Sequence, residues 1–390
     1  MHAQLSYYSA HMDTSTAENS SLPSLRRLCA APTSPLQFKY KDSRDDFVVE
    51  ELPLYEPSGT GTHTWLWIEK RGLTTHAAAR ALAQKLGKNP ADAGIAGLKD
   101  AHAVTRQWIS FEHVTQSAED IRAFSDEELK VLLVTRHGNK LRMGHLRGNR
   151  FVIRLKLAGE ARPQESVLEK SSADLLARAE FVLAELSRRG IPNYFGEQRF
   201  GNTGTNSALG RMLVLGDTAG FNAAMSGVGQ ARQIHDRKIR NLLVNAYQSE
   251  LFNRVLAARM PDPGTLLPGD LACLHRNGAV FKIVSGEDAR TAQPRADLHE
   301  ISPSGPIFGP KMAQPEGVPG ELEARILQEE GVSLADFGRN EAERQPGARR
   351  PLRVFFLEAP HAAIDGGSVV VRFALPSGSY ATVVLDEVRG

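Results

Sequence analysis

The sequence contains little cysteine and no long apolar run. Cys29 and Cys273 are the only cysteines among its 390 residues, which excludes a disulfide scaffold and fits a reducing compartment. The apolar runs are short, as in "VLLV" at 131–134, whereas a membrane-spanning helix needs roughly 20 apolar residues. The N-terminus lacks the basic and apolar regions of a secretory signal. These absences predict a cytoplasmic protein without a membrane partner.

Motifs of several enzyme classes are also missing. The chain has no Walker-type G-x-x-x-x-G-K-[ST], no G-x-S-x-G, no H-E-x-x-H and no paired C-x-x-C. Its histidines are scattered, and adjacent acids such as Glu50 and Glu51 point to opposite faces of a strand. Neither a metal site nor a glycosidase-type acid pair is therefore indicated. We expect no cofactor and no metal, and the net charge of +2 points to no particular partner.

Hydrophobic periodicity predicts the elements of the first half. Residues 1–36 are rich in Ser, Ala, Thr and Pro and show no period, so we expect a mostly disordered leader. Beyond it, alternation predicts half-buried strands and helical spacing predicts helices. The expected strands lie at 46–52, 64–69, 107–112 and 150–157, and the expected helices at 73–87 and from about 173 to 189. In the strand at 150–157, Phe151, Ile153 and Leu155 share one face.

In the second half the strand patterns give way to helical spacing and loops, and strand patterns return near the C-terminus. Helical spacing extends over 236–260. Segments around it that are rich in Gly and Pro are expected to be loops, at 201–220, 261–270 and 302–320. Alternating runs that predict strands return at 352–358, 368–375 and 379–385. This order indicates one domain inserted into another, with the outer parts forming an α+β fold around a mixed β-sheet.

One acid stands alone among cations in "GIAGLKDAHAVTRQW", residues 94–108. Asp100 lies between Lys99 and His102, with Arg106 close behind. A surface ion pair is one explanation. A catalytic carboxylate kept ionised by the neighbouring charges is the other, because opposite charge favours the carboxylate form.

The strongest charge signal is "RHGNKLRMGHLRGNR", residues 136–150, which we call the basic strip. It holds five Lys/Arg and two His and no acid. It is either a solvated loop or a phosphate-binding strip, and we favour the second because the next strand keeps its cations on one face. The residues expected to contact an RNA backbone are Arg136, Lys140, Arg142 and Arg147.

Aromatic residues accompany these cations, among them Phe47, Trp108, Phe151 and Tyr380. Such rings are usually core residues, and Phe151 fits that explanation well. Unpaired bases are, however, held by stacking on such rings while polar neighbours contact the base edge. The amide of Asn149 is a candidate for such a contact. Composition and spacing alone thus indicate a two-domain RNA-binding protein and go no further.

The stretch around Asp100, "AGLKDAHAVTRQW" at 96–108, resembles the signature of the TruD family of tRNA pseudouridine synthases. Further stretches resemble the family in the same order over nearly everything after residue 37. They are "DFVVEELPLYEPSGTGTHTWLWIEKRGLTT", "HGNKLRMGHLRGNRFVIRL", "GIPNYFGEQRFG", "AYQSELFN" and "LPSGSYATVVLDEV". The resemblance implies isomerisation of uridine to pseudouridine in RNA, typically at uridine 13 of certain tRNAs.

The resemblance also implies roles for individual residues. Asp100 matches the catalytic position, and Lys41 matches a basic position near it. The positions that match substrate contacts are Phe47, Asn149, Phe151 and Tyr380, with Phe151 expected beside the target base. Family members often carry Phe where this chain has Tyr380, so the role of its hydroxyl stays open.

The resemblance further implies an inserted domain, covering 190–348 here, which agrees with the insertion indicated by the pattern. The catalytic domain is then expected in two parts, 37–189 and 349–390. We expect tRNA as the partner and a monomeric protein.

Several questions stay open at this point. Asp100 acts either as a nucleophile at C1′ or as a base on the ribose. Lys41, Lys99 and Arg106 are the candidate cations beside it, and the resemblance favours Lys41. A catalytically inactive RNA-binding protein on the same fold and an RNA N-glycosylase remain the rival functions.

Overall fold

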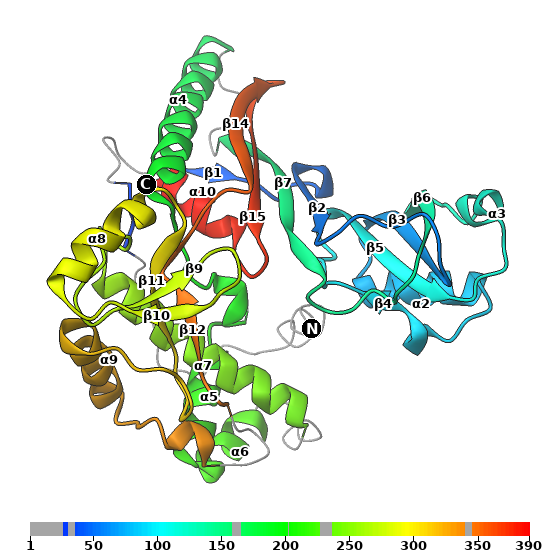
Figure 1. Cartoon of the computed structure of the whole chain (residues 1–390). Coiled ribbons are helices and arrows are strands. Elements are labelled where there is room, and N and C mark those ends of the chain that lie inside the picture. The colour runs from blue at the N-terminus through cyan, green and yellow to red at the C-terminus, as the bar shows by residue number, and fades with distance from the viewer. Residues whose placement is uncertain (1–25, 30–35, 158–164, 202, 227–235, 340–344) are drawn as a thin grey trace.

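The chain folds around two separate β-sheets joined by a short two-stranded ribbon (Figure 1). The computed structural model describes residues 26–29, 36–157, 165–201, 203–226, 236–339 and 345–390. The larger sheet has nine strands, the smaller one has four, and helices pack against both. The expected α+β fold with a mixed sheet is thus confirmed. No helix in the described ranges is long and apolar enough to cross a bilayer.

The nine-stranded sheet is built from both ends of the chain. Its strands follow the order β14-β15-β7-β2-β5-β3-β6, while β1 pairs with β7 and β4 with β5. The sheet is mixed because β2 and β5 run parallel and its other described pairs are antiparallel. The bounds are β1 Phe38–Lys39, β2 Phe47–Pro53, β3 His63–Arg71, β4 Gly94–Ile95, β5 Val104–Glu112, β6 Leu129–His137, β7 Leu146–Leu157, β14 Glu358–Asp365 and β15 Ser368–Pro376.

Helix α2 (Thr75–Lys85) packs on the half of this sheet that contains β3, β5 and β6. The side chain of Thr74 accepts a hydrogen bond from the backbone N–H of Ala77 and so caps the first turn. Ala78, Leu82 and other apolar side chains on one face of α2 are buried against the strands. The predicted strands at 46–52, 64–69 and 107–112 and the predicted helix are all present.

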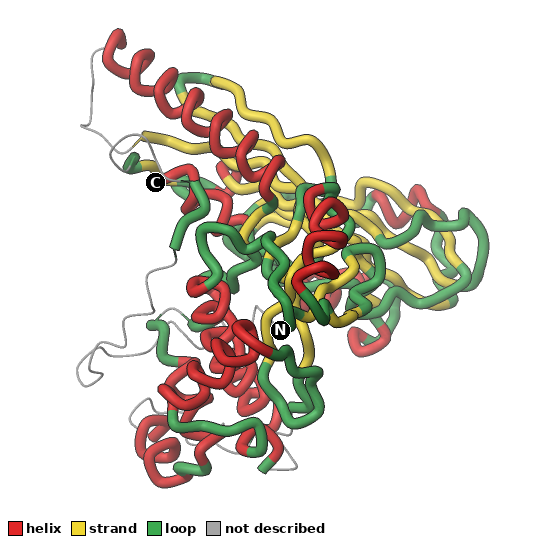
Figure 2. Tube along the Cα trace, turned by 60° about the vertical axis from the view of Figure 1, so that its left-hand side comes forward, coloured by secondary structure: helices red, strands yellow, loops and turns green. Residues whose placement is uncertain are grey.

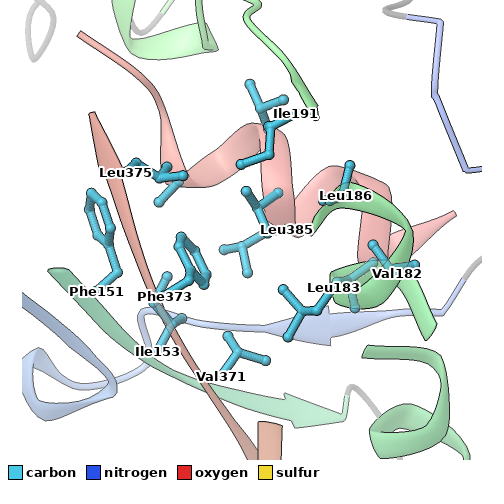
Figure 3. Packing of buried hydrophobic residues seen from close by; sticks show 14 of the residues in the cluster. Phe151, Ile153, Val182, Leu183, Leu186, Ile191, Val371, Phe373, Leu375 and Leu385 are labelled. Carbon is cyan, nitrogen blue, oxygen red and sulfur yellow. The ribbon is translucent and has the colours of Figure 1, made fainter. Parts of the chain in front are cut away.

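The other half of the sheet is covered by α4 (Glu165–Arg189) and α10 (Ala381–Arg389). As predicted, the apolar face of β7 is buried: Ile153 and Leu155 are fully covered and Phe151 is 7% exposed. Figure 3 shows Phe151 and Ile153 beside residues of β15 and α10 within this cluster. Figure 2 shows the strands of the large sheet in yellow, with α4 running along one side of them.

Two of the expected C-terminal strands are not formed as predicted. Residues 379–385 were expected to form a strand, but Ala381–Arg389 is helix α10. Its buried residues Ala381, Val384, Leu385 and Val388 recur at helical spacing, so core packing outweighs the β-propensity of the valines. The expected strand at 352–358 is reduced to β13 (Arg353–Val354), and a separate strand, β14, begins at Glu358.

The smaller sheet lies in the middle of the chain and has the order β10-β9-β11-β12. Helices surround it in the lower left of Figure 1. The elements of this region are β8 Ile191–Pro192, η3 Glu197–Arg199, α5 Asn206–Leu215, α6 Thr218–Ser226, α7 Arg237–Ala258, β9 Leu271–Leu274, β10 Val280–Lys282, α8 Gly286–Asp297, β11 Ile301–Ile307, α9 Gly317–Glu330, η5 Asp336–Gly338 and β12 Ala348–Pro351. Short elements elsewhere are η1 Arg44–Asp46, η2 Pro90–Asp92 and α3 Ala118–Arg122.

Two predicted loops in this region are wrong. The segment 201–220 contains α5 and the start of α6. Its Gly210 marks close packing rather than a loop, because a Cβ there would lie 2.1 Å from the carbonyl oxygen of Leu243 on α7. The segment 302–320 contains most of β11. This strand tolerates its prolines because its first half pairs only with β9 and its second half only with β12.

Part of the predicted disordered leader is packed. Residues 1–25 and 30–35 lie outside the described residues, but Leu28 and Cys29 are buried. Their backbone N–H groups donate to the carboxylate of Glu387 on α10, at 2.8 and 2.9 Å. Residues 28 and 29 of the expected leader are therefore ordered, because these bonds and the buried side chains compensate the cost of ordering them, and disorder over the rest stays a prediction.

The chain passes from the large sheet to the small one, and back again, at a single place. Strand β8 pairs antiparallel with β13, with Ile191 opposite Val354 and Pro192 opposite Arg353. The described elements between them include the whole small sheet. The exact boundaries at 189/190 and 348/349 stay a prediction.

Candidate active site

Asp100 lies on the loop that joins β4 to β5, beside the parallel strand β2. Lys41 Nζ donates a hydrogen bond to its Oδ2 at 3.1 Å, and the backbone N–H of His102 donates to Oδ1 at 2.9 Å. The Asp100 side chain is 30% exposed. Both carboxylate oxygens are therefore fixed by donors while solvent still reaches the group.

These contacts control the charge of Asp100. Burial acts to raise its pKa, but the His102 N–H and the Lys41 ammonium outweigh burial and lower the pKa below its ordinary value. Asp100 is consequently an anion at neutral pH. The arrangement supplies an ionised carboxylate that is oriented, partly dehydrated and accessible.

Lys70 on β3 fixes the backbone around Asp100 by hydrogen bonds. Its Nζ donates to the carbonyl oxygens of Leu73 at 2.6 Å, Asp100 at 2.9 Å and Lys99 at 3.4 Å. Lys70 is fully buried, and burial lowers its pKa to about 8 although Asp100 opposes the shift. One buried side chain thus fixes the backbone of Asp100 relative to the sheet.

A second brace comes from α2 and β5. Thr75 Oγ1 accepts from the backbone N–H of Lys99 and donates to Gln107 Oε1, both at 2.9 Å. Gln107 Nε2 in turn donates to the carbonyl of Gly97 at 3.3 Å. Thr75 and Gln107 are fully buried. Sequence reasoning missed Lys70, Thr75 and Gln107 as site residues, because their partners are distant in sequence.

The other two candidate cations bind other acids. Lys99 Nζ lies 2.9 Å from Glu51 Oε2, and both side chains are buried. Arg106 contacts Glu69 and Glu50 on the sheet. Lys41 is therefore the one of the three candidates that contacts the Asp100 carboxylate, as the resemblance favoured.

Three predicted substrate contacts share one face of the sheet. In the antiparallel pairing of β2 with β7, Phe47 lies opposite Ile153, and Glu51 lies opposite Asn149. Phe47, Asn149 and Phe151 therefore point to the same side. Lys41 Nζ lies 4.4 Å from the centroid of the Phe47 ring, and the Phe47 and Phe151 centroids are 6.2 Å apart. A continuous series of contacts thus joins Asp100 to Phe151.

The side-chain oxygen of Asn149 lacks a hydrogen-bond partner within the described part of the chain, whereas the ring of Phe151 is packed in the core. The Oδ1 atom of Asn149 is buried and has no hydrogen-bond partner among the described residues. Phe151, in contrast, packs in the core with its centroid 5.5 Å from that of Phe373. The core interpretation therefore describes Phe151 well, whereas Asn149 has an unused acceptor.

Tyr380 reaches this region from the C-terminal part of the chain. It precedes α10, and its ring lies 6.1 Å from that of Phe195. No described contact joins it directly to Asp100. Its loop, however, meets β7 beside Asn149, because Leu375 lies opposite Asn149 and the Ser377 N–H donates to the Arg147 carbonyl at 3.0 Å.

Comparisons with known proteins agree on one family. The family described as tRNA pseudouridine synthase D (TruD) matches residues 27–235 and 226–388. The chain is 39% identical to tRNA pseudouridine synthase D of Geobacter metallireducens, with 89% of this chain and 94% of that one covered. It is 43% identical to that of Anaeromyxobacter dehalogenans strain 2CP-C, with 88% and 90% covered. The chain belongs to the TruD family.

The fold of this TruD family member is also similar to that of a solved structure. The crystal structure of the putative tRNA pseudouridine synthase D from Methanosarcina mazei superposes with a TM-score of 0.73. The sequence identity is 24%, and the match covers 92% of this chain and 94% of that chain.

The basic strip of this TruD family member is divided by the structure. Arg142 and Arg147 are exposed, and Lys140 is partly exposed. Arg136 donates to the Val114 carbonyl at 3.0 Å. Arg150, at the end of the strip, is bound between Glu50 and Glu358, two acids that are distant in sequence. The strip therefore has fewer available charges than its sequence suggests.

Proposed function

We propose that the chain isomerises uridine to pseudouridine in tRNA, at uridine 13 of certain tRNAs, with Asp100 as the catalytic residue. Membership of the TruD family supports the reaction. The observation that carries the assignment of Asp100 is its carboxylate, which is held ionised by Lys41 and the His102 N–H and is 30% exposed.

The reaction breaks the bond between N1 of uracil and C1′ of ribose and forms a bond between C5 and C1′. The base turns between these steps, the proton on C5 leaves to solvent and N1 takes up a proton, so the mass is unchanged and no oxidant or reductant is needed. An ionised Asp100 serves either as the nucleophile at C1′ or as the base that removes a ribose proton. Lys41 favours the charged form that both routes require.

The target base must leave its stack to reach Asp100, at a cost of a few kcal/mol. Phe47, Asn149, Phe151 and Tyr380 are the proposed contacts that offset this cost. Asn149 has the strongest support, because its buried Oδ1 lacks a partner and the N3–H of uracil is a donor that satisfies it. Its amide nitrogen remains available to a carbonyl oxygen of the same base.

The RNA backbone is proposed to follow the basic strip. Arg142 and Arg147 are exposed, which supports them more strongly than Arg136 and Lys140. Arg136 already uses one of its N–H groups on the Val114 carbonyl. The division into catalytic parts 37–189 and 349–390 and an inserted domain 190–348 is kept as part of the proposal, supported by the β8–β13 pairing.

The test is to map pseudouridine in cellular tRNA with and without this protein, and to measure tritium release in vitro from RNA labelled at C5 of uridine. We expect a pseudouridine at position 13 that depends on the protein, together with stoichiometric tritium release. Binding without tritium release would identify an inactive RNA-binding protein. Free uracil and an abasic ribose, detected by mass, would identify an N-glycosylase, because isomerisation leaves the RNA mass unchanged.

A further inference from the structure

Two arginines gather around one aromatic ring where the two sheets meet. Arg199 belongs to η3, and Arg350 belongs to β12. Their guanidinium carbons lie 5.6 and 4.2 Å from the centroid of Phe195, and that of Arg350 lies 5.5 Å from the centroid of Phe252. Both side chains are partly exposed. They are thus reachable from solvent while much of their surface is covered.

Neither arginine has an acidic partner among the described residues. Arg199 Nε donates to Ser249 Oγ at 3.1 Å. Arg350 donates to the backbone and side-chain oxygens of Asn193 and, at 3.0 Å, to the carbonyl of Gly378. All of these acceptors are neutral. By contrast Arg254, Arg259 and Arg349 of the same region each contact a carboxylate.

The lack of an acidic partner within the described part of the chain has an energetic consequence. Burial lowers the pKa of both groups, that of Arg350 to about 10, and the neighbouring Arg199 adds to the shift of Arg350. Like charges held together in a partly dehydrated place are costly unless an anion joins them. The observed neighbours stabilise the guanidinium groups by ring faces and neutral oxygens only. An anionic ligand is the component that completes such a cluster.

The place of the cluster indicates which anion it receives. Arg350 donates a hydrogen bond to the carbonyl of Gly378, in the loop that leads to Tyr380. Burial raises the pKa of Tyr380, and both arginines lie close enough to oppose part of that rise. The same loop meets β7 beside Asn149. On the other side of Asn149, Glu51 binds Lys99, the neighbour of Asp100. The cluster and the Asp100 loop therefore converge on one end of β7.

We propose that Arg199 and Arg350 bind one phosphodiester group of the RNA strand next to the target nucleotide. Planar guanidinium groups donate to phosphate oxygens in pairs, and the Tyr380 hydroxyl is a further donor at the same place. This inference rests on the proposed function only in that RNA is the ligand. It assigns the site to the segments that enter and leave the small sheet, rather than to the basic strip.

The first test is the salt dependence of tRNA affinity for Arg199→Gln. Arg199 suits the test because its side chain makes one hydrogen bond to the described residues, whereas Arg350 also ties Asn193 to Gly378. The control is Arg211→Gln, whose charge is already paired with Glu330. We expect Arg199→Gln to reduce the slope of log K against log salt by about one and Arg211→Gln to leave it unchanged. An unchanged slope for Arg199→Gln overturns the proposal.

The second test locates the phosphate. Short RNA substrates in which one linkage at a time carries a neutral methylphosphonate are bound to protein with Asp100→Asn, with and without Arg199→Gln. We expect one linkage beside the target uridine at which the neutral group weakens binding only while Arg199 is present. If the methylphosphonate weakens binding equally with and without Arg199→Gln at every linkage, the proposal is overturned. Pseudouridine formation is measured separately with unaltered Asp100, so a protein without activity that still shows the coupling refutes the proposed reaction and leaves the phosphate site standing.

Discussion

The Asp100 loop and the basic strip are both rich in charge, but they use it differently. The charged groups of the loop have fixed partners: Asp100 binds Lys41, and Lys99 binds Glu51. Lys70 on the neighbouring β3 donates to three carbonyl groups at the loop. In the strip, Arg142 and Arg147 are exposed and form no ion pair with a described residue. The function of the loop therefore depends on the positions of single atoms, whereas RNA binding by the strip depends on its total charge. Substitutions in the loop should alter turnover, whereas those in the strip should alter affinity.

The largest effect is expected for Asp100→Asn. The substitution keeps the shape of the side chain but removes the negative charge, so neither attack on C1′ nor removal of a ribose proton proceeds. Turnover should fall below detection, while tRNA binding persists or strengthens slightly because one repelling charge is lost. Single-turnover conversion with enzyme in excess measures this. Substantial residual conversion, after mass spectrometry has excluded deamidation to Asp, would refute the assignment.

Lys70→Met is expected to come next, although Lys70 does not touch the Asp100 carboxylate. The variant leaves three carbonyl groups without their shared donor and frees the backbone of Asp100. A displacement of about 1 Å costs roughly 100-fold in rate, so kcat should fall by this order with little change in KM. The matched control is Lys85→Met at the end of α2, which packs on the same half of the sheet; Lys85 is an exposed lysine that donates to the Phe124 carbonyl. If both variants have equal kcat, Lys70 does not position Asp100.

Lys41→Met tests the charge rather than the position of Asp100. Without the ammonium, one of the two donors that stabilise the anion is lost and burial still acts to raise the pKa. The pKa of Asp100 therefore rises, and the acidic limb of the pH–rate profile moves to higher pH. Loss of a charge-assisted hydrogen bond of about 1.5–3 kcal/mol corresponds to a rate loss of roughly 10- to 100-fold. If the acidic limb stays at the wild-type pH, Lys41 does not control the pKa of Asp100.

The smallest effect per residue is expected in the basic strip. Arg142→Gln and Arg147→Gln should each weaken tRNA binding and reduce the salt slope by up to about one unit, with turnover of bound tRNA unchanged. Arg150→Gln is the internal control, because Glu50 and Glu358 already neutralise that charge. Fluorescence titration of tRNA over a range of salt concentrations measures all three. A larger slope change for Arg150 than for Arg142 would reverse our view of the strip.

The sequence predicted much of the fold because its strands alternate clearly, and 150–157 even gave the correct buried face. It failed where two patterns compete. In α10 the valines favour a strand, while the spacing of Ala381, Val384 and Val388 favours the helix that forms. In α5 the glycine suggests a loop, although Gly210 only allows two helices to approach. Packing against distant segments decides such cases.

The candidate site was predictable only where a local motif marks it. Asp100 stands out as the single acid in its stretch, and Lys41 entered through the family resemblance. Lys70 and Gln107 are ordinary strand residues by pattern, and only the folded chain brings them beneath the loop. The pair of Arg199 and Arg350 is separated by about 150 residues of sequence, so no local window contains it.

The pairing of β8 with β13 bears on how the fold accommodates insertions and deletions. The strands that precede and follow the small sheet lie side by side, about 5 Å apart. Residues can therefore be inserted or deleted between them without changing the distance between the two points at which the chain leaves and rejoins the large sheet. Changes in that interval must still preserve its own buried core, such as the close packing of α5 on α7 at Gly210.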